Sequence, residues 1–295
     1  MGLFITSLNS GSNANCYFVG NGADAVLIDA GLSAKETVKR MHRLGLSMEA
    51  VKAVFVSHEH ADHVLGLNTL HKKFKLPVYI TAKTRKHSML ELDNALVFPF
   101  LDGRPIRIGG LEVVPFKKYH DAADAHSFIV KGAGFTVGVM TDLGYACDVV
   151  KHYFSLCDAV FLEANYDTDM LMNGKYPPAL KRRISGGNGH LSNVQALELF
   201  LHHRSAHLQL LILSHLSKNN NRPEIVSDVF QPHAGKVAIT IAGRNSETAV
   251  FSLLEKKFFP YEKPLFEKTT YPAKAGSTRH KTTRKKDNVL QLRLF

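Results

Sequence analysis

The feature that most constrains this chain is a group of three histidines and one aspartate packed into positions 58–63. It directly follows the apolar, β-branched run 54–56, which predicts a buried strand that stops where the polar group begins. Because side chains of extended residues alternate between two sides, His58 and His60 point the same way. Asp62 and His63 fall in the first turn of the following helix. The sequence therefore predicts that His58 and His60 bind one metal ion, while Asp62 and His63 bind a second.

Imidazole and carboxylate ligands together favour Zn, Mn or Fe over Ca or Mg, so two divalent ions of the former kind are expected. The alternative is a solvated loop that happens to be rich in histidine. It is disfavoured because so many polar side chains at the end of a core strand are costly without a ligand. The same pattern, an apolar run that ends in a possible ligand, returns at Asp29, Asp142 and His215. Layered α/β scaffolds typically build their sites from several such strand ends.

Two strand-rich runs, each followed by helices, predict an α/β (α+β) fold, an αββα four-layer sandwich that spans residues 1–261. Caps and hydrophobic periodicity place helices at about 33–44, 64–74, 84–96, 147–155 and 192–203. Segment 175–189 contains a Lys-Arg-Arg run and is predicted to be irregular. From about residue 261 the apolar periodicity stops, so 262–290 is expected to be a basic, disordered linker before the last five residues.

The formal charge of +11 points to a polyanionic partner, which could be a nucleic acid or an anionic membrane. About half of the excess lies after residue 261, where nine Lys or Arg face three Asp or Glu. No apolar run approaches the roughly 20 residues of a membrane span, and the first residues resemble a strand rather than a secretory signal. Three scattered cysteines fit reduced thiols, so a cytoplasmic protein without a membrane partner is expected.

Several short motifs of this sequence, taken in chain order, resemble those of a known family. The chain resembles the metallo-β-lactamase superfamily and, within it, the YycJ/WalJ-like branch of bacterial nucleases. The motifs are Ser10-Gly11-Ser12, Leu27-Ile28-Asp29-Ala30-Gly31, His58-x-His60-x-Asp62-His63, His120-Asp121-Ala122, Thr141-Asp142-Leu143-Gly144, Gly189-His190-Leu191-Ser192-Asn193 and His215-Leu216-Ser217-Lys218-Asn219-Asn220.

The resemblance implies a binuclear centre. One metal ion would be held by His58, His60 and His120. The other would be held by Asp62, His63 and His215, with Asp142 and a hydroxide as bridges. For the third ligand of the first ion, the neighbouring His126 remains an alternative. Asp29 is expected to orient a ligand rather than to bind metal.

The resemblance also implies a metal-dependent phosphodiesterase that acts on DNA, as a 5′-to-3′ exonuclease in replication or repair. His190 would stabilise the phosphoryl oxygens or protonate the leaving oxygen, and the alternative is a loop histidine with no catalytic part. Lys181, Arg182 and Arg183 could contact flanking phosphates, or could simply form a solvated face. An RNase, a thioesterase or lactonase of the same fold, and a non-catalytic nucleic-acid-binding module remain alternatives.

The last five residues form a separate motif. Gln291, Leu292, Leu294 and Phe295 resemble the Gln-Leu-x-Leu-Phe peptide by which bacterial replication and repair proteins dock on the DNA polymerase sliding clamp. Leu and Phe would fill an apolar pocket while Gln hydrogen-bonds at its rim. A short strand that packs back onto the domain is the alternative.

Overall fold

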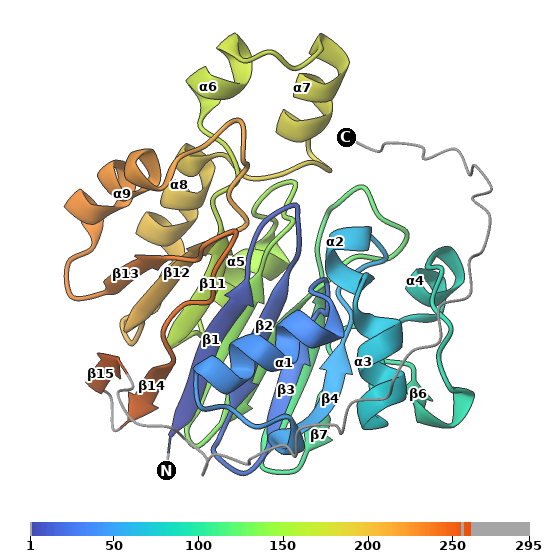
Figure 1. Cartoon of the computed structure of the whole chain (residues 1–295). Helices are drawn as coiled ribbons and strands as arrows, with labels where there is room; N and C mark the ends of the chain where they lie inside the picture. Colours follow the sequence, from blue (N-terminus) through green and yellow to red (C-terminus); the bar gives the residue numbers. More distant parts are fainter. Residues whose placement is uncertain (1, 255–256, 261–295) are drawn as a thin grey trace, which may run out of the picture.

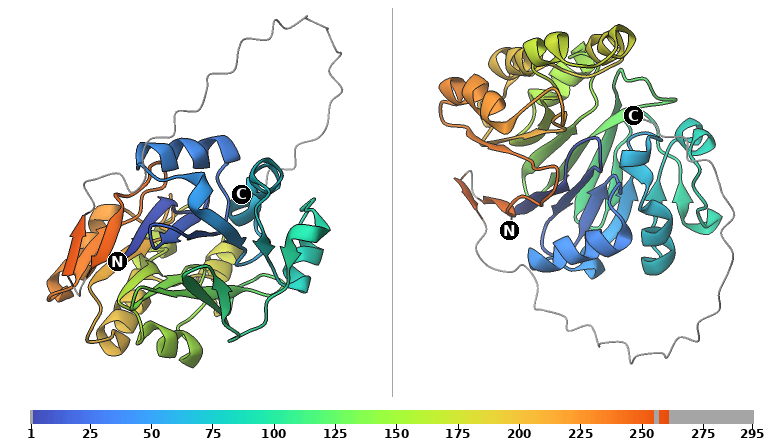
Figure 2. Two further views of the ribbon diagram at one scale, coloured as in Figure 1. Left: turned by 90° about the horizontal axis from the view of Figure 1, so that it is seen from below. Right: turned by 45° about the horizontal axis from the view of Figure 1, so that its top comes forward.

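Two β-sheets pack face to face in this protein, and helices cover both outer faces (Figure 1). The computed structural model describes residues 2–254 and 257–260. Seen from below, helix, sheet, sheet and helix follow one another as four layers (Figure 2). This confirms the predicted αββα sandwich. The predicted linker 262–290 and docking peptide 291–295 lie outside the described residues.

The first sheet has eight strands, and its half from β3 to β6 is parallel. Its strands, in spatial order, are β15 (Lys257–Pro260), β14 (Phe251–Leu254), β1 (Leu3–Asn9), β2 (Cys16–Gly20), β3 (Ala25–Ile28), β4 (Val51–Phe55), β5 (Val78–Tyr79) and β6 (Val97–Phe98).

The second sheet has seven strands, and its half from β10 to β13 is parallel. Its strands, in spatial order, are β13 (Ala238–Ile241), β12 (Leu210–Ser214), β11 (Ala159–Glu163), β10 (Phe135–Met140), β9 (His126–Gly132), β8 (Leu111–Lys117) and β7 (Ile106–Ile108).

The core between the sheets follows the two-residue period of the strands. In β4, Ala53 and Phe55 face the second sheet, whereas Val54 packs in the cluster beneath the helices. The ring of Phe55 meets Phe128 of the second sheet edge-on, with centroids 5.7 Å apart. β4 is buried on both faces, which explains its nearly continuous apolar sequence.

Seven of the helices cover the two sheets. The first sheet is covered by α1 (Ala34–Arg43), α2 (Ala61–Val64), α3 (Leu67–Phe74) and α4 (Ala82–His87), and the second by α5 (Asp148–Phe154), α8 (Asn193–His203) and α9 (Pro223–Phe230). α8 begins with the reciprocal Ser192–Gln195 capping box. Short 3-10 turns occur at Met48–Ala50, Asn94–Leu96 and Gln231–His233.

Two predicted segments differ from the structure. The helix expected over 84–96 ends at His87, and only a 3-10 turn follows, because Asp93 caps a new turn by accepting a hydrogen bond from Ala95 N. The segment 175–189, expected to be irregular, contains helix α7 (Pro178–Ser185). α7 fully buries none of its residues, and its apolar face consists of Leu180 and Ile184 alone, which is too little for hydrophobic periodicity to indicate a helix.

α7 and its predecessor α6 (Thr168–Asn173) project from the end of the sandwich above the strand tips (Figure 1). They are inserted between β11 and α8. None of the helices in the described part of the chain combines the length and hydropathy needed to cross a bilayer.

Candidate metal centre

The loops at one end of the two sheets bring the predicted ligands together. His58 lies just beyond β4, Asp142 just beyond β10 and His215 directly after β12. Asp142 and His215 have φ of +55° and +58°, and Asp29, after β3, has +62°. Side chains other than glycine rarely adopt this left-handed backbone, and such residues concentrate at functional sites. The chain therefore turns sharply at each strand end and directs a polar side chain into one shared space.

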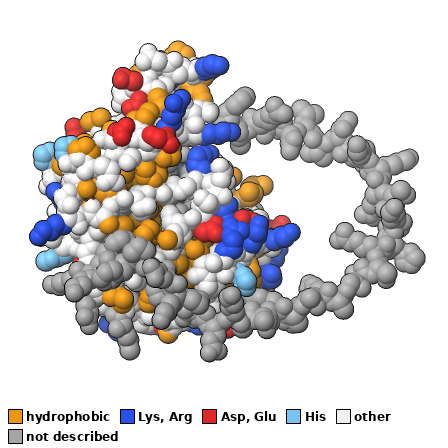
Figure 3. All heavy atoms as spheres, turned by 60° about the vertical axis from the view of Figure 1, so that its left-hand side comes forward, with side chains coloured by type: hydrophobic (Ala, Val, Ile, Leu, Met, Phe, Trp, Pro, Cys, Tyr) orange, Lys and Arg blue, Asp and Glu red, His pale blue; other side chains and the backbone are white. Residues whose placement is uncertain are grey.

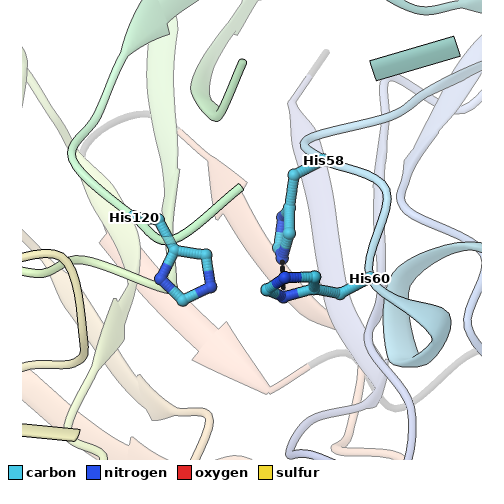
Figure 4. Close-up of side chains that lie close together, drawn as sticks. All are labelled: His58, His60 and His120. Atoms are coloured by element: carbon cyan, nitrogen blue, oxygen red, sulfur yellow. Dashed lines mark hydrogen bonds between the residues drawn. The ribbon is translucent and has the colours of Figure 1, made fainter. Parts of the chain in front are cut away.

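The first predicted triad meets at this end of the sandwich. His58 Nε2 lies 3.1 Å from His60 Nδ1, and the His120 ring lies 4.9 and 5.1 Å from the rings of His58 and His60. Figure 4 shows the three rings turned toward one another. One ring nitrogen from each histidine lies within 4.8 Å of the other two, a spacing that suits one metal ion. Burial, together with the charges of His63 and Lys118, lowers the pKa of His58, which leaves a neutral imidazole with a free lone pair.

The alternative ligand His126 is placed elsewhere. Its Nδ1 donates to the backbone oxygen of Asp124 at 2.9 Å, and its ring packs edge-on against Phe100. Of the two candidates, the structure brings His120 and not His126 into the cluster.

The second predicted triad, Asp62, His63 and His215, forms an adjoining group whose ligand atoms also lie within 4.8 Å. Asp62 Oδ2 is 3.4 Å from His63 Nε2 and 3.6 Å from His215 Nε2. Burial lowers the pKa of His215, but Asp142, Asp62 and Glu163 outweigh it and raise that pKa to about 10. This excess of negative charge is the environment that a bound cation would neutralise.

Asp142 lies between the two groups, as a bridging ligand requires. Its Oδ2 is 3.3 Å from His63 Nε2, and its Oδ1 is 3.8 Å from His120 Nε2. Burial raises the pKa of this carboxyl, yet His215 and His63 outweigh burial and hold the pKa well below its usual value.

Asp29 contacts a ligand from behind, as expected. Its Oδ2 accepts a hydrogen bond from His63 Nδ1 at 2.7 Å, and its two oxygens also accept from the backbone and hydroxyl of Ser57. This contact leaves Nε2 of His63 to face Asp62 and Asp142.

Several buried polar atoms of the centre fit metal ligation. His120 Nε2, Asp142 Oδ2 and His215 Nε2 make no hydrogen bond within the described part of the chain. A buried polar atom without a partner is destabilising, and these three face the shared space. The donor set of imidazole and carboxylate therefore fits Zn, Mn or Fe.

Glu163, the last residue of β11, is a site residue that the sequence did not reveal. It is fully buried, and its Oε1 accepts from His190 Nδ1 and His215 Nδ1, both at 2.9 Å. Burial raises the pKa of Glu163, but His190 and the two hydrogen bonds outweigh it and lower the pKa to about 2. His190, which is partly exposed, is thereby held at the edge of the centre.

Lys118 is a second residue that the sequence did not reveal. Its ammonium group is buried and donates to Thr141 O at 2.7 Å. Burial lowers the pKa of Lys118, while Asp142 and Asp29 oppose that change. A positive charge therefore lies behind the acidic ligands.

The three basic residues predicted to contact phosphate lie on α7. Arg183 forms an ion pair with Asp121, beside His120. Lys181 donates to Met172 O in the α6–α7 unit, and Arg182 is exposed. The structure therefore links Arg183 to the His120 loop through Asp121, while Lys181 and Arg182 lie on the same helix.

Comparison with known proteins agrees with this arrangement. Residues 24–216 match the family described as the beta-lactamase superfamily domain, a range that includes every residue from Asp29 to His215. The chain belongs to the metallo-β-lactamase superfamily. The position of both metal-ligand groups at the same end of the sandwich fits this membership.

Within the superfamily, the chain is 34% identical to exodeoxyribonuclease YycJ of Bacillus anthracis, over 76% of this chain and 86% of that one. It is 28% identical to exodeoxyribonuclease WalJ of Streptococcus pneumoniae over the same shares. Among solved structures, Zn(2+)-bound PqqB from Methylobacterium extorquens has the same fold, with a TM-score of 0.65, 14% identity and coverage of 83% of this chain and 99% of that one.

Proposed function

We propose that this chain is a metal-dependent phosphodiesterase that degrades DNA from an end, in the 5′-to-3′ direction. The convergence of two metal-ligand groups on Asp142, with His190 at their edge, is the observation that carries this proposal. The exodeoxyribonuclease names of the two relatives support DNA as the substrate. The formal charge of +11 fits a polyanion.

Each residue has a defined part in the chemistry. His58, His60 and His120 would hold one divalent ion, and Asp62, His63 and His215 the other, with Asp142 shared. When bound, the ions would activate water and offset negative charge on the phosphodiester. His190 would protonate the leaving oxygen, and the hydrogen bond that its Nδ1 donates to Glu163, which would hold the ring in place, supports this role. The ligand set accepts Zn, Mn or Fe.

A single assay tests the proposal. Purified protein is given end-labelled single- and double-stranded DNA and RNA, with Mn or Zn supplied or with a chelator. We expect metal-dependent release of nucleotides from DNA ends. Preferential cleavage of RNA would instead assign an RNase. Hydrolysis of thioesters or lactones without nuclease activity would assign a small-substrate enzyme, and nucleic-acid binding without any turnover would assign a non-catalytic binding module.

Replacement of a ligand gives the matching prediction for the metal. His58→Ala removes a donor from the first ligand group, and Asp62→Ala removes one from the second. In each variant the metal content and the rate of hydrolysis should fall together. Elemental analysis beside the nuclease assay measures both. Full metal content in both variants would contradict the ligand assignment. His152→Ala, which changes a histidine in α5, is the control.

A further part of the proposal concerns contacts with the substrate outside the metal centre. Lys181, Arg182 and Arg183 are proposed to contact phosphates that flank the scissile bond, which the position of Arg183 beside the His120 loop supports.

We also infer a cytoplasmic setting in a bacterium and a role in replication or repair. Three free cysteines and the bacterial sources of the relatives support this.

The proposed partner is the DNA polymerase sliding clamp. Its docking peptide would be Gln291, Leu292, Leu294 and Phe295, which lie outside the described residues, so the sequence motif alone supports this contact. Deletion of 291–295 should spare hydrolysis of free DNA but end clamp binding, measured by surface plasmon resonance. Unchanged affinity would refute the docking peptide.

A further inference from the structure

We propose that Tyr119 and Tyr145 form a stacking platform for an unpaired nucleotide base at the edge of the metal centre. This inference deepens the proposed nuclease function and rests on it. It defines the substrate end as single-stranded at the point where the chain is cut.

The two rings pair with each other on the surface. Their centroids are 4.7 Å apart with an interplanar angle of 31°, and the residues are 51% and 39% exposed. Two large aromatic side chains at this exposure leave ring surface available to a ligand.

The loops that carry the rings are the loops that carry metal ligands. Tyr119 directly precedes His120, and Tyr145 follows three residues after Asp142. Gly144 N donates to Tyr119 O at 2.7 Å, which fastens the two loops to each other. The position of the rings is therefore set by the same backbone that sets the ligands.

The same loops also pack against the segment before His190. A Cβ at Gly144 would lie only 2.1 Å from Gly187 O, so these backbones are in close contact. His120 Nδ1 donates to Gly189 O at 3.0 Å. The tyrosine pair thus lies beside the segment that carries His190, the proposed proton donor, which is partly exposed.

Positive charge lies on the same side of the centre. Arg183 pairs with Asp121, two residues from Tyr119, and α7 contains three basic residues and no acidic one. Figure 3 shows basic side chains (blue) along the right-hand edge of the projecting tip that α6 and α7 form. A basic helix beside exposed rings is the combination that proteins use to hold single-stranded nucleic acid, with the helix on the phosphates and the rings on the bases.

An unpaired end fits this arrangement. Bases inside a duplex stack on both faces and offer no free ring, whereas a terminal unpaired base can leave its neighbours and stack on an aromatic side chain. Stacking accepts any base, which suits an enzyme that removes nucleotides without regard to sequence.

The test compares Tyr119→Ala and Tyr145→Ala with Tyr119→Phe and Tyr145→Phe, which keep the rings. Phe98→Ala is the matched control, because it removes a ring that is 40% exposed on edge strand β6. Substrates are a single-stranded oligonucleotide and the same oligonucleotide with abasic residues at its end. Metal content of every variant is measured to show that the centre is intact.

We expect each Ala variant to raise KM about tenfold on the base-bearing end, with a smaller change in kcat, as loss of one stacked base predicts. The effect should vanish on the abasic end, and the Phe variants and Phe98→Ala should behave as wild type. Unchanged KM in both Ala variants, or an equal loss on the abasic end, would overturn the platform.

A binding measurement separates failure of the platform from failure of the proposed function. Fluorescence anisotropy with the same oligonucleotides in the presence of a chelator needs no cleavage. Weaker binding by the Ala variants supports the platform even if wild type cuts nothing, and only the nuclease proposal then fails. Equal binding by wild type and Ala variants overturns the platform while DNA cleavage by wild type still stands.

Discussion

Glu163 lies buried at the end of β11 and accepts hydrogen bonds from both His190 and His215. It therefore couples His190, the proposed proton donor, to His215, a proposed metal ligand. Glu163→Gln keeps the shape but removes the charge, so we expect kcat to fall roughly 10–100-fold, as is typical when a partner of a metal ligand is lost. Steady-state kinetics with elemental analysis measures this. A kcat equal to wild type with metals in place would show that the contact is only structural.

The residues of the site differ in how far the sequence could reveal them. Asp142 and His215 each follow an apolar run, so their position at a strand end was predictable, and the structure brings them together. Glu163 also ends an apolar run, but a carboxylate at the end of a strand is just as often a solvent-exposed side chain with no part in a site. Lys118 gave no signal, since its ammonium is buried only because distant loops fold over it.

At the scale of elements, α1 is joined to the loop after β13 by charged side chains. Arg43 binds Glu247 through two hydrogen bonds, at 2.6 and 2.7 Å. The hydrogen bond from Arg43 lowers the pKa of Glu247 below its usual 4.5, so the pair adds stability above that pH and loses it as pH falls through the folded-state pKa.

Glu247→Gln should therefore lower the free energy of unfolding modestly at pH 7, since the pair is partly exposed to solvent. The difference from wild type should shrink toward zero at pH 3. Urea unfolding at both pH values measures it, with Glu49→Gln on the surface as the control. A difference that persists undiminished at pH 3 would mean that packing, not charge, is responsible.

Elements with a buried face were the predictable ones. α8 has an apolar pattern and a cap that match its observed limits closely, and the apolar run 54–56 overlaps the end of β4, which begins earlier, at Val51. α6 and α7 bury a single residue between them, Leu171, so hydrophobic periodicity had almost nothing to register. Their helical form depends instead on local caps: Asp167 accepts from Met170 N at the start of α6, and Pro178 opens α7.

At the scale of the whole molecule, the metal centre joins the two sheets. His58 and His63 follow β4 of the first sheet, while Asp142 and His215 follow strands of the second. Ions bound there stabilise the folded state only, because the unfolded chain does not bring these ligands together.

Removal of metal should therefore lower Tm. A ligand present at about 1,000 times its Kd contributes roughly 4 kcal/mol, and about 2–4 °C per kcal/mol applies at this chain length. We expect a fall of about ten degrees on chelation. Differential scanning calorimetry measures it. His58→Ala should show a much smaller dependence on chelator, and an equal fall in that variant would place the stabilising ions elsewhere.

At Asp29, Asp142 and His215, relief of the left-handed backbone strain and retention of the side chains of the centre favour different residues. Glycine would relax each of these turns by roughly 1 kcal/mol, but at Asp142 and His215 it would also remove a proposed ligand of ions whose binding contributes more than that. A library screened for heat resistance with metal supplied should therefore keep these two residues, whereas the same screen in chelator should enrich glycine there, and that reversal would locate the centre without any assay of turnover.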